Sequence, residues 1–163
     1  MIIKNARRTA VALALVAFAA VSAQAQTATQ TVTFQVNAIN QIAFTGSPSL
    51  TITTAVAGSA PTSVTDASAS WAVTTNQSTA KITANIPLNM VAGLTLSSNL
   101  TAPTGGTSAG FQALSTVAVD LVTGITKIAQ GSLGVSYKLD ATAAAGVIAS
   151  GSRVVTYTIT GGT

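Results

Sequence analysis

Apolar and polar residues alternate with a period of two along most of this chain, and such alternation predicts strands that bury one face. Turn-forming Gly, Pro, Asn and Ser separate the alternating segments, and no segment has the 3.6-residue period of an amphipathic helix. The pattern predicts an all-β fold, namely an antiparallel immunoglobulin-like β-sandwich. The predicted strands cover residues 30–38, 49–54, 69–75, 81–86, 93–100, 113–122, 133–140 and 153–160, and residues 42–44 extend or follow the first.

The first predicted strand, residues 30–38, alternates most strictly. Its apolar positions are Val32, Phe34, Val36 and Ala38, with Thr, Gln and Asn between them. Two interpretations stay open. The segment is the first strand of its own sandwich, or it leaves its domain and completes the sheet of a neighbouring subunit, where main-chain hydrogen bonds give affinity and alternate side chains fill pockets. In the second case these four residues are the candidate donor-strand residues.

The N-terminal segment, residues 1–25, has the three parts of a secretory signal peptide. Lys4, Arg7 and Arg8 precede an apolar run over residues 9–21, and Ala23-Gln24-Ala25 offers small residues at the expected cleavage positions. The apolar run is short for a membrane span, so we expect cleavage before Gln26 rather than an uncleaved anchor. This predicts a single mature domain over residues 26–163 without a membrane span, exported by the secretion machinery to the outside or the cell surface.

Removal of the signal changes the charge balance. The whole chain has 7 Lys and Arg against 3 Asp, but three of the bases lie in the signal, so the mature chain carries 4 − 3 = +1. A basic stripe with interleaved aromatic residues is absent from the sequence, which argues against a nucleic-acid partner. The chain also has no Cys, so the domain must be stabilised by burial and backbone hydrogen bonds rather than by disulfides.

Residues that support catalysis or metal binding are almost missing. The chain has no His, Cys or Glu, and its three acids, Asp66, Asp120 and Asp140, are far apart in sequence without Ca²⁺-loop spacing. We therefore predict no catalytic residues, no metal site and no cofactor, and we interpret the Asp residues as turn-capping or solvated. The lone Trp71 is expected in the core between two sheets rather than on a sugar-binding surface.

Several features together resemble a known class of bacterial proteins. The signal peptide, the early alternating strand, the Thr-rich middle and the closing RVVTYTIT at residues 153–160 are similar to small secreted subunits of the spore-coat-U and archaic chaperone–usher fimbrial type. Unlike many members, this chain has no cysteine. The resemblance implies a structural subunit of a surface fibre or coat that is assembled by strand donation.

Two function classes follow. The first is a non-enzymatic subunit of an extracellular fibre, pilus-like filament or coat, whose partners are further copies or related subunits and whose candidate assembly strand is residues 30–38. The alternative is a monomeric exported binding or adhesin domain that uses loops such as residues 102–110. In the first class, deletion of residues 30–38 abolishes assembly but leaves secretion intact. In the second class, loop substitution removes saturable binding to a glycan or surface.

Overall fold

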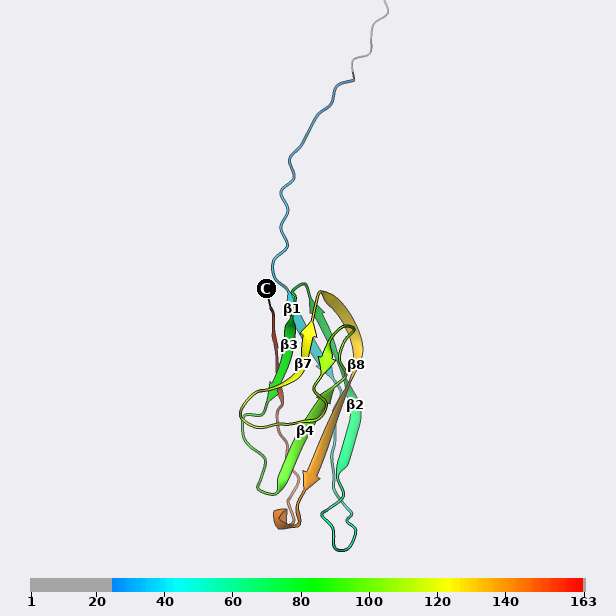
Figure 1. Ribbon diagram of the computed structural model, residues 1–163, viewed down its shortest axis with the longest axis vertical. Helices are drawn as coiled ribbons and strands as arrows, with labels where there is room; N and C mark the ends of the chain where they lie inside the picture. Colours follow the sequence, from blue (N-terminus) through cyan, green and yellow to red (C-terminus); the bar gives the residue numbers. More distant parts are fainter. Residues whose placement is uncertain (1–24, 163) are drawn as a thin grey trace, which may run out of the picture. The chain divides into compact units, whose positions relative to one another are not determined.

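The computed structural model describes residues 25–162, and the expected signal peptide, residues 1–25, lies outside them except for Ala25. The chain divides into two compact units, Met1–Gln35 and Val36–Thr163. The described part of the first unit, residues 25–35, forms no helix or strand, and its side chains are exposed. Every strand of the described residues belongs to the second unit (Figure 1).

The second unit consists of two antiparallel sheets, which confirms the predicted all-β sandwich class. One sheet has the order β1-β2-β8-β4-β6 and the other the order β5-β7-β3-β9. A short 3₁₀ helix, η1 (Ala143–Ala145), follows β8. The strands are β1 (Asn40–Thr45), β2 (Val64–Thr75), β3 (Ala80–Asn85), β4 (Leu94–Leu100), β5 (Thr107–Ser108), β6 (Gln112–Ala113), β7 (Val119–Ile125), β8 (Ile128–Ala141) and β9 (Thr156–Thr160).

The core between the sheets is mostly aliphatic, as the composition requires. Ile82, Leu121 and Val135 are completely buried, and they come from β3, β7 and β8. Trp71 is only 2% exposed and its indole N–H donates to the carbonyl of Thr101 at 3.2 Å, which confirms the predicted core position. Burial of these side chains is the main favourable contribution to folding, and each is worth about 1.5–3 kcal/mol relative to an exposed position.

Several predicted strands are present with shifted ends. The segments predicted at 81–86, 93–100 and 133–140 correspond to β3, β4 and β8, and the segment at 69–75 is the second half of β2. The bounds of the strand predicted at 113–122 are wrong, because residues 114–118 form no strand and β7 begins at Val119. β7 continues to Ile125, because Gly124 adopts φ 73° and the pairing with β3 tolerates an irregularity at that level.

Three segments with strand-like alternation form no ladder in the described part of the chain. They are residues 30–38, 49–54 and 153–155. The prediction of a strand at 30–38 is therefore wrong for this chain taken alone, and the first strand of its sandwich is β1 instead. Alternation reports which side chains share a face, but a strand also needs a neighbouring edge that pairs with its N–H and C=O groups.

Candidate binding groove

An apolar groove runs along the side of the sandwich where both sheets end. β1 pairs only with β2, and β9 pairs only with β3, so each of these edge strands has one edge without a ladder partner. The groove has a volume of about 1300 Å³ and follows the two chain segments that continue these edges, residues 48–55 after β1 and residues 146–155 before β9. Figure 1 shows that these segments lie toward the end of the sandwich that carries η1.

The first wall, residues 48–55, keeps the period-two pattern without forming a strand. Leu50 and Ile52 are half-buried, whereas the Ser and Thr residues between them are exposed. Gly46 turns the chain from β1 into this wall at φ +105°, and a Cβ there would lie 2.8 Å from the Cα of Ala69. Only glycine fits both the conformation and the space at this position.

The second wall, residues 146–155, is also extended and unbonded. In the part of the chain that the structure describes, no backbone–backbone hydrogen bond joins residues 147–155 or residues 50–53 to a neighbouring segment. Most residues of both walls are exposed, so their unpaired backbone groups are open to solvent. Both walls therefore present main-chain donors and acceptors that could accept an added strand.

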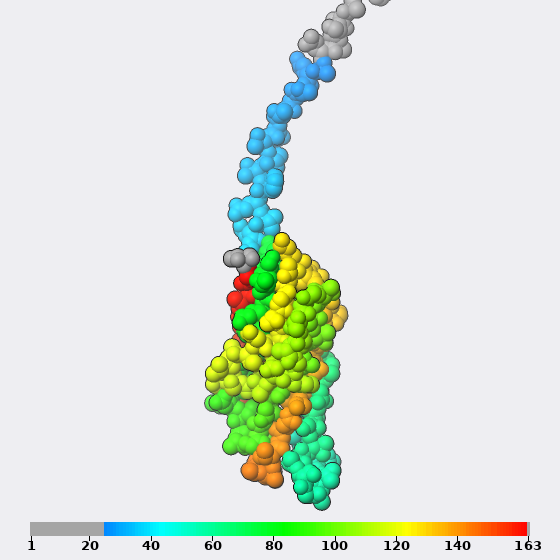
Figure 2. All heavy atoms as spheres, in the orientation of Figure 1, coloured from blue at the N-terminus to red at the C-terminus, as the bar shows by residue number. Residues whose placement is uncertain are grey.

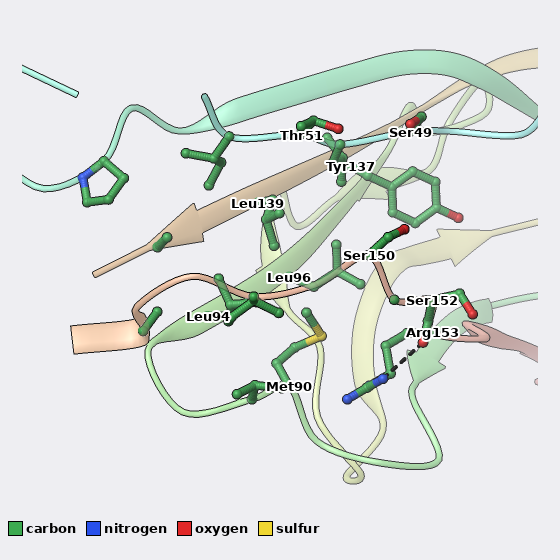
Figure 3. A pocket seen from close by; sticks show the side chains of 18 of the residues that line it. Ser49, Thr51, Met90, Leu94, Leu96, Tyr137, Leu139, Ser150, Ser152 and Arg153 are labelled. Atoms are coloured by element: carbon green, nitrogen blue, oxygen red, sulfur yellow. Dashed lines mark hydrogen bonds between the residues drawn. The ribbon is translucent and has the colours of Figure 1, made fainter. Parts of the chain in front are cut away.

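The floor of the groove is made by the two sheets. Leu94 and Leu96 of β4 and Leu139 of β8 lie beside Met90 from the preceding loop, and Figure 3 shows the side chains of these residues around one cavity. Tyr137 of β8 lies at the same floor with its ring beside the walls (Figure 3). The surface offered to a ligand is aliphatic and aromatic, without a charged group on the floor.

An aromatic cluster joins the two edges within the groove. The rings of Phe44 on β1 and Tyr157 on β9 stack at a centroid distance of 3.9 Å, and Phe44 also stacks on Trp71 at 6.0 Å. The Tyr157 hydroxyl bonds to the hydroxyls of Tyr137 at 2.7 Å and Ser98 at 3.1 Å. Burial raises the pKa of both tyrosines, so both stay protonated. The cluster holds β1 against β9, and the groove walls continue away from it.

Arg153 in the second wall leaves one donor unused. Its guanidinium donates to the carbonyl of Ser152 at 2.9 Å and to the carbonyl of Asn89 at 3.3 Å, as the dashed line to Ser152 in Figure 3 illustrates. Its Nε is buried and has no hydrogen-bond partner among the described residues. A buried donor without a partner costs about 1–3 kcal/mol. The second wall is thus incompletely bonded in its side chains as well as its backbone.

The three Asp carboxylates have separate partners and do not meet. Asp66 accepts the backbone N–H of Ser68 at 2.7 Å and that of Ser49 at 2.8 Å, and bonds from Ser68 and Ser49 lower its pKa. Asp66 thereby ties the start of the first wall to β2. Asp140 accepts the Ser63 hydroxyl, which lowers its pKa, and Lys138 at 3.1 Å, while Asp120 accepts Lys81 at 2.9 Å.

No group of His, Cys, Asp or Glu residues that could hold a metal ion occurs among residues 25–162. Within the same residues, no helix is long and apolar enough to cross a bilayer.

The candidate donor residues lie outside the strands. Val32 and Phe34 belong to the first unit, and Val36 and Ala38 belong to the second; all four are exposed, Phe34 to 89%. The sequence does not predict the groove, because the alternation at residues 49–54 predicts an ordinary strand. The sequence signal for the groove is that residues 49–54 and 153–155 alternate in the same way as residues 30–38. Comparison with protein-family models, with curated proteins and with solved structures finds no match to this chain.

Proposed function

We propose that this chain is a non-enzymatic structural subunit of an extracellular fibre, pilus-like filament or coat. The candidate strand at residues 30–38 of one copy supplies residues 30–36, which insert into the groove of the next copy and complete its sandwich. One observation carries the proposal: the segments that have a strand pattern but no ladder are residues 30–38, residues 49–54 in the first groove wall and residues 153–155 in the second. Insertion of the first between the other two would bring all three into a β-ladder.

The dimensions of the two parts support this pairing. At about 3.3 Å per residue, residues 30–36 extend over ~23 Å and the wall at residues 48–55 over ~26 Å. Val32, Phe34 and Val36 recur at every second position, so they would all point to the groove floor when the segment is extended. The aliphatic floor of Leu94, Leu96 and Leu139 suits such side chains, which are otherwise exposed to water.

Burial of apolar side chains and new main-chain hydrogen bonds would both favour the bound state. Exposed large apolar side chains gain about 1.5–3 kcal/mol each on full burial, and three of them enter the groove together. The main-chain hydrogen bonds of the added strand come in addition and would use the unbonded walls. The near-neutral mature chain, with a net charge of +1, has little charge repulsion to oppose association.

The experiment compares two charge substitutions at neighbouring positions of the chain that begins at Gln26. In an inserted strand, Phe34→Asp would place a carboxylate on the apolar floor, whereas Thr33→Asp would point away from it. We expect the unsubstituted chain and Thr33→Asp to form concentration-dependent polymers in size-exclusion chromatography and negative-stain microscopy, and Phe34→Asp to stay monomeric. An unsubstituted chain that remains monomeric at high concentration, or equal polymerisation of both variants, contradicts the proposal.

The added strand can also be supplied separately. A chain that lacks residues 26–36 should bind a synthetic peptide of residues 28–38 in trans, and its melting temperature should rise with peptide concentration. The matched control is the same peptide with Phe34→Asp, which should not raise the melting temperature. If loop substitutions at residues 102–110 removed binding to a surface while neither peptide bound, the adhesin alternative would replace this proposal.

A further inference from the structure

The chain just before β1 is held in place by the side chain of Asn76. Its Oδ1 accepts the N–H of Ile39 at 2.8 Å, and its Nδ2 donates to the carbonyl of Asn37 at 2.7 Å. The backbone N–H of Asn76 also donates to the carbonyl of Ile39 at 3.3 Å. The Asn76 amide therefore takes the place of a peptide group and continues the β1–β2 ladder beyond the pair Asn40↔Thr75.

This clamp fixes the direction in which the chain approaches β1. Residues 37–39 prolong β1 at its N-terminal end, whereas the first groove wall, residues 48–55, follows its C-terminal end. The preceding segment would have to reverse direction before Asn37 to reach the groove of its own copy. Ala38 lies between two clamped residues, so the part that can enter another copy ends at Val36.

The opposite end of the sandwich, which we call the mouth end, carries exposed apolar side chains. It is formed by the loops at residues 56–59, 86–93 and 142–148, and the last two are joined by the bond from Thr142 N–H to the carbonyl of Gly93 at 2.8 Å. Figures 1 and 2 show the turn near residue 58 and η1 at this end. The exposed apolar residues here are Val56, Leu88, Val91, Val147 and Ile148.

We infer that neighbouring copies touch directly, with the clamped end of one copy seated on the mouth end of the next. This inference rests on the proposed strand donation and names the second surface that such an assembly would bury. The inserted residue Val36 is covalently followed by the clamped residue Asn37, and one residue spans at most about 3.6 Å. The sandwich of the donor copy must therefore lie against the groove mouth, without a flexible linker.

The clamped end offers an apolar surface for this contact. Ile39 is 40% exposed there, and a small hollow of about 300 Å³ lies between it and Ile128 and Ala129 at the start of β8. The clamped end and the mouth end are different surfaces at opposite ends of one sandwich. Such a heterologous contact does not close on itself and produces an open filament. A reciprocal dimer, in which two clamped ends face each other, would instead leave both mouth ends exposed.

The first experiment separates strand donation from the direct contact. A Gly-Ser spacer of about eight residues between Val36 and Asn37 has a root-mean-square reach of about 15 Å, which is enough to part the two sandwiches. We expect filaments whose persistence length in electron micrographs falls severalfold, while the donor strands remain inserted. Spacer filaments as stiff as the original overturn the inference but leave the proposed function standing. If the unsubstituted chain forms a closed dimer, the open stack is contradicted. If the unsubstituted chain stays monomeric, the proposed function itself is contradicted.

A pair of substitutions tests the direct contact between copies if the chain with the spacer does not polymerise. Val56→Ser with Leu88→Ser removes exposed apolar surface at the mouth end, and neither residue lines the groove. We expect shorter, more flexible filaments that dissociate at lower temperature, with peptide binding to the groove unchanged. The control is Phe111→Ser, because Phe111 is also exposed but lies under the Lys138 ammonium at 5.6 Å, away from the mouth end. Equal filaments from the double variant and the control contradict the inference.

Discussion

The two sides of this sandwich are built from similar residues but differ in how their backbones are bonded. On the sealed side, β2 and β8 pair over almost their full lengths, and β4 continues the ladder with an uninterrupted register from Leu94 to Leu100. On the open side, β1 and β9 each have one partner, and in the described chain residues 50–53 and 147–155 beside them have no backbone hydrogen bond to a neighbouring segment. Both sides alternate Val, Ile and Leu with Thr and Ser. The difference lies in whether a neighbouring edge exists, not in strand propensity.

This contrast shows where a β-sheet protein can have a binding site without reactive side chains. An unpaired edge beside an apolar floor binds through main-chain groups, which every residue has, and selects through the spacing of apolar side chains. The open side has these properties. Within residues 25–162, it is also the side with a buried side-chain donor that lacks a partner, the Nε of Arg153.

The largest expected difference between the two sides is in the cost of truncating an isoleucine. Ile82 is completely buried at the centre of β3, so Ile82→Ala should lower the free energy of unfolding by about 3–4 kcal/mol. Ile52 in the first wall is only half-buried, and Ile52→Ala should cost less than about 1 kcal/mol in a chain that lacks residues 26–36. Urea unfolding of the two variants, followed by Trp71 fluorescence, measures both values.

The same pair can be measured again with the peptide of residues 28–38 bound. The Ile52→Ala penalty should then grow, because the wall becomes buried, and the Ile82→Ala penalty should stay as it was. Equal penalties for Ile52→Ala with and without peptide would show that the first wall takes no part in binding.

A smaller effect is expected where the two sides meet, at Tyr157. Tyr157→Phe keeps the ring stacked on Phe44 but removes the hydroxyl that bonds to Tyr137 and to the completely buried Ser98. A buried hydroxyl without a partner costs about 1–2 kcal/mol, so we expect a loss of that size in urea unfolding. The control Thr158→Val changes the next residue, which is exposed, and should stay within about 0.5 kcal/mol.

The tyrosine cluster also predicts an alkaline limit. The pKa values of Tyr137 and Tyr157 are raised in the folded chain, so their stabilising contribution is complete below the ordinary value of 10.0 and is lost as the pH rises beyond it. Tyr157→Phe should lose less stability than the unsubstituted chain between pH 9 and pH 11. Parallel pH profiles for the two proteins would contradict the buried position of the hydroxyl pair.

Periodicity predicted the sealed side well and the open side only in part. The alternation of residues 81–86 and 93–100 predicts strands that the structure contains, because each has neighbours on both edges. The same alternation at residues 30–38 and 49–54 predicts strands that are absent from the described chain, because side-chain period carries no information on the partner edge. The Asn76 clamp was also beyond prediction, since it depends on a residue 37 positions from Ile39 in sequence.

The smallest expected effect concerns the carboxylate that ties the first wall to β2. Asp66 is ionised in its bonds to Ser68 and Ser49, and its pKa is below the ordinary value of 3.8. Its contribution to stability is therefore complete above that value and is lost as the pH falls through the lower folded pKa. Asp66→Asn should weaken peptide binding slightly at pH 7 and should make binding less sensitive to acid between pH 5 and pH 2.

Asp120→Asn is the matched control for Asp66→Asn, because Asp120 forms an exposed pair with Lys81 on β3, away from both walls. We expect this control to bind the peptide of residues 28–38 as the unsubstituted groove does at pH 7, because exposed ion pairs contribute little. Titration calorimetry across the pH range compares the three proteins. If Asp66→Asn and Asp120→Asn gave the same profile, the bond from Ser49 N–H to Asp66 would not shape the groove, and the first wall would owe its position to Gly46 alone.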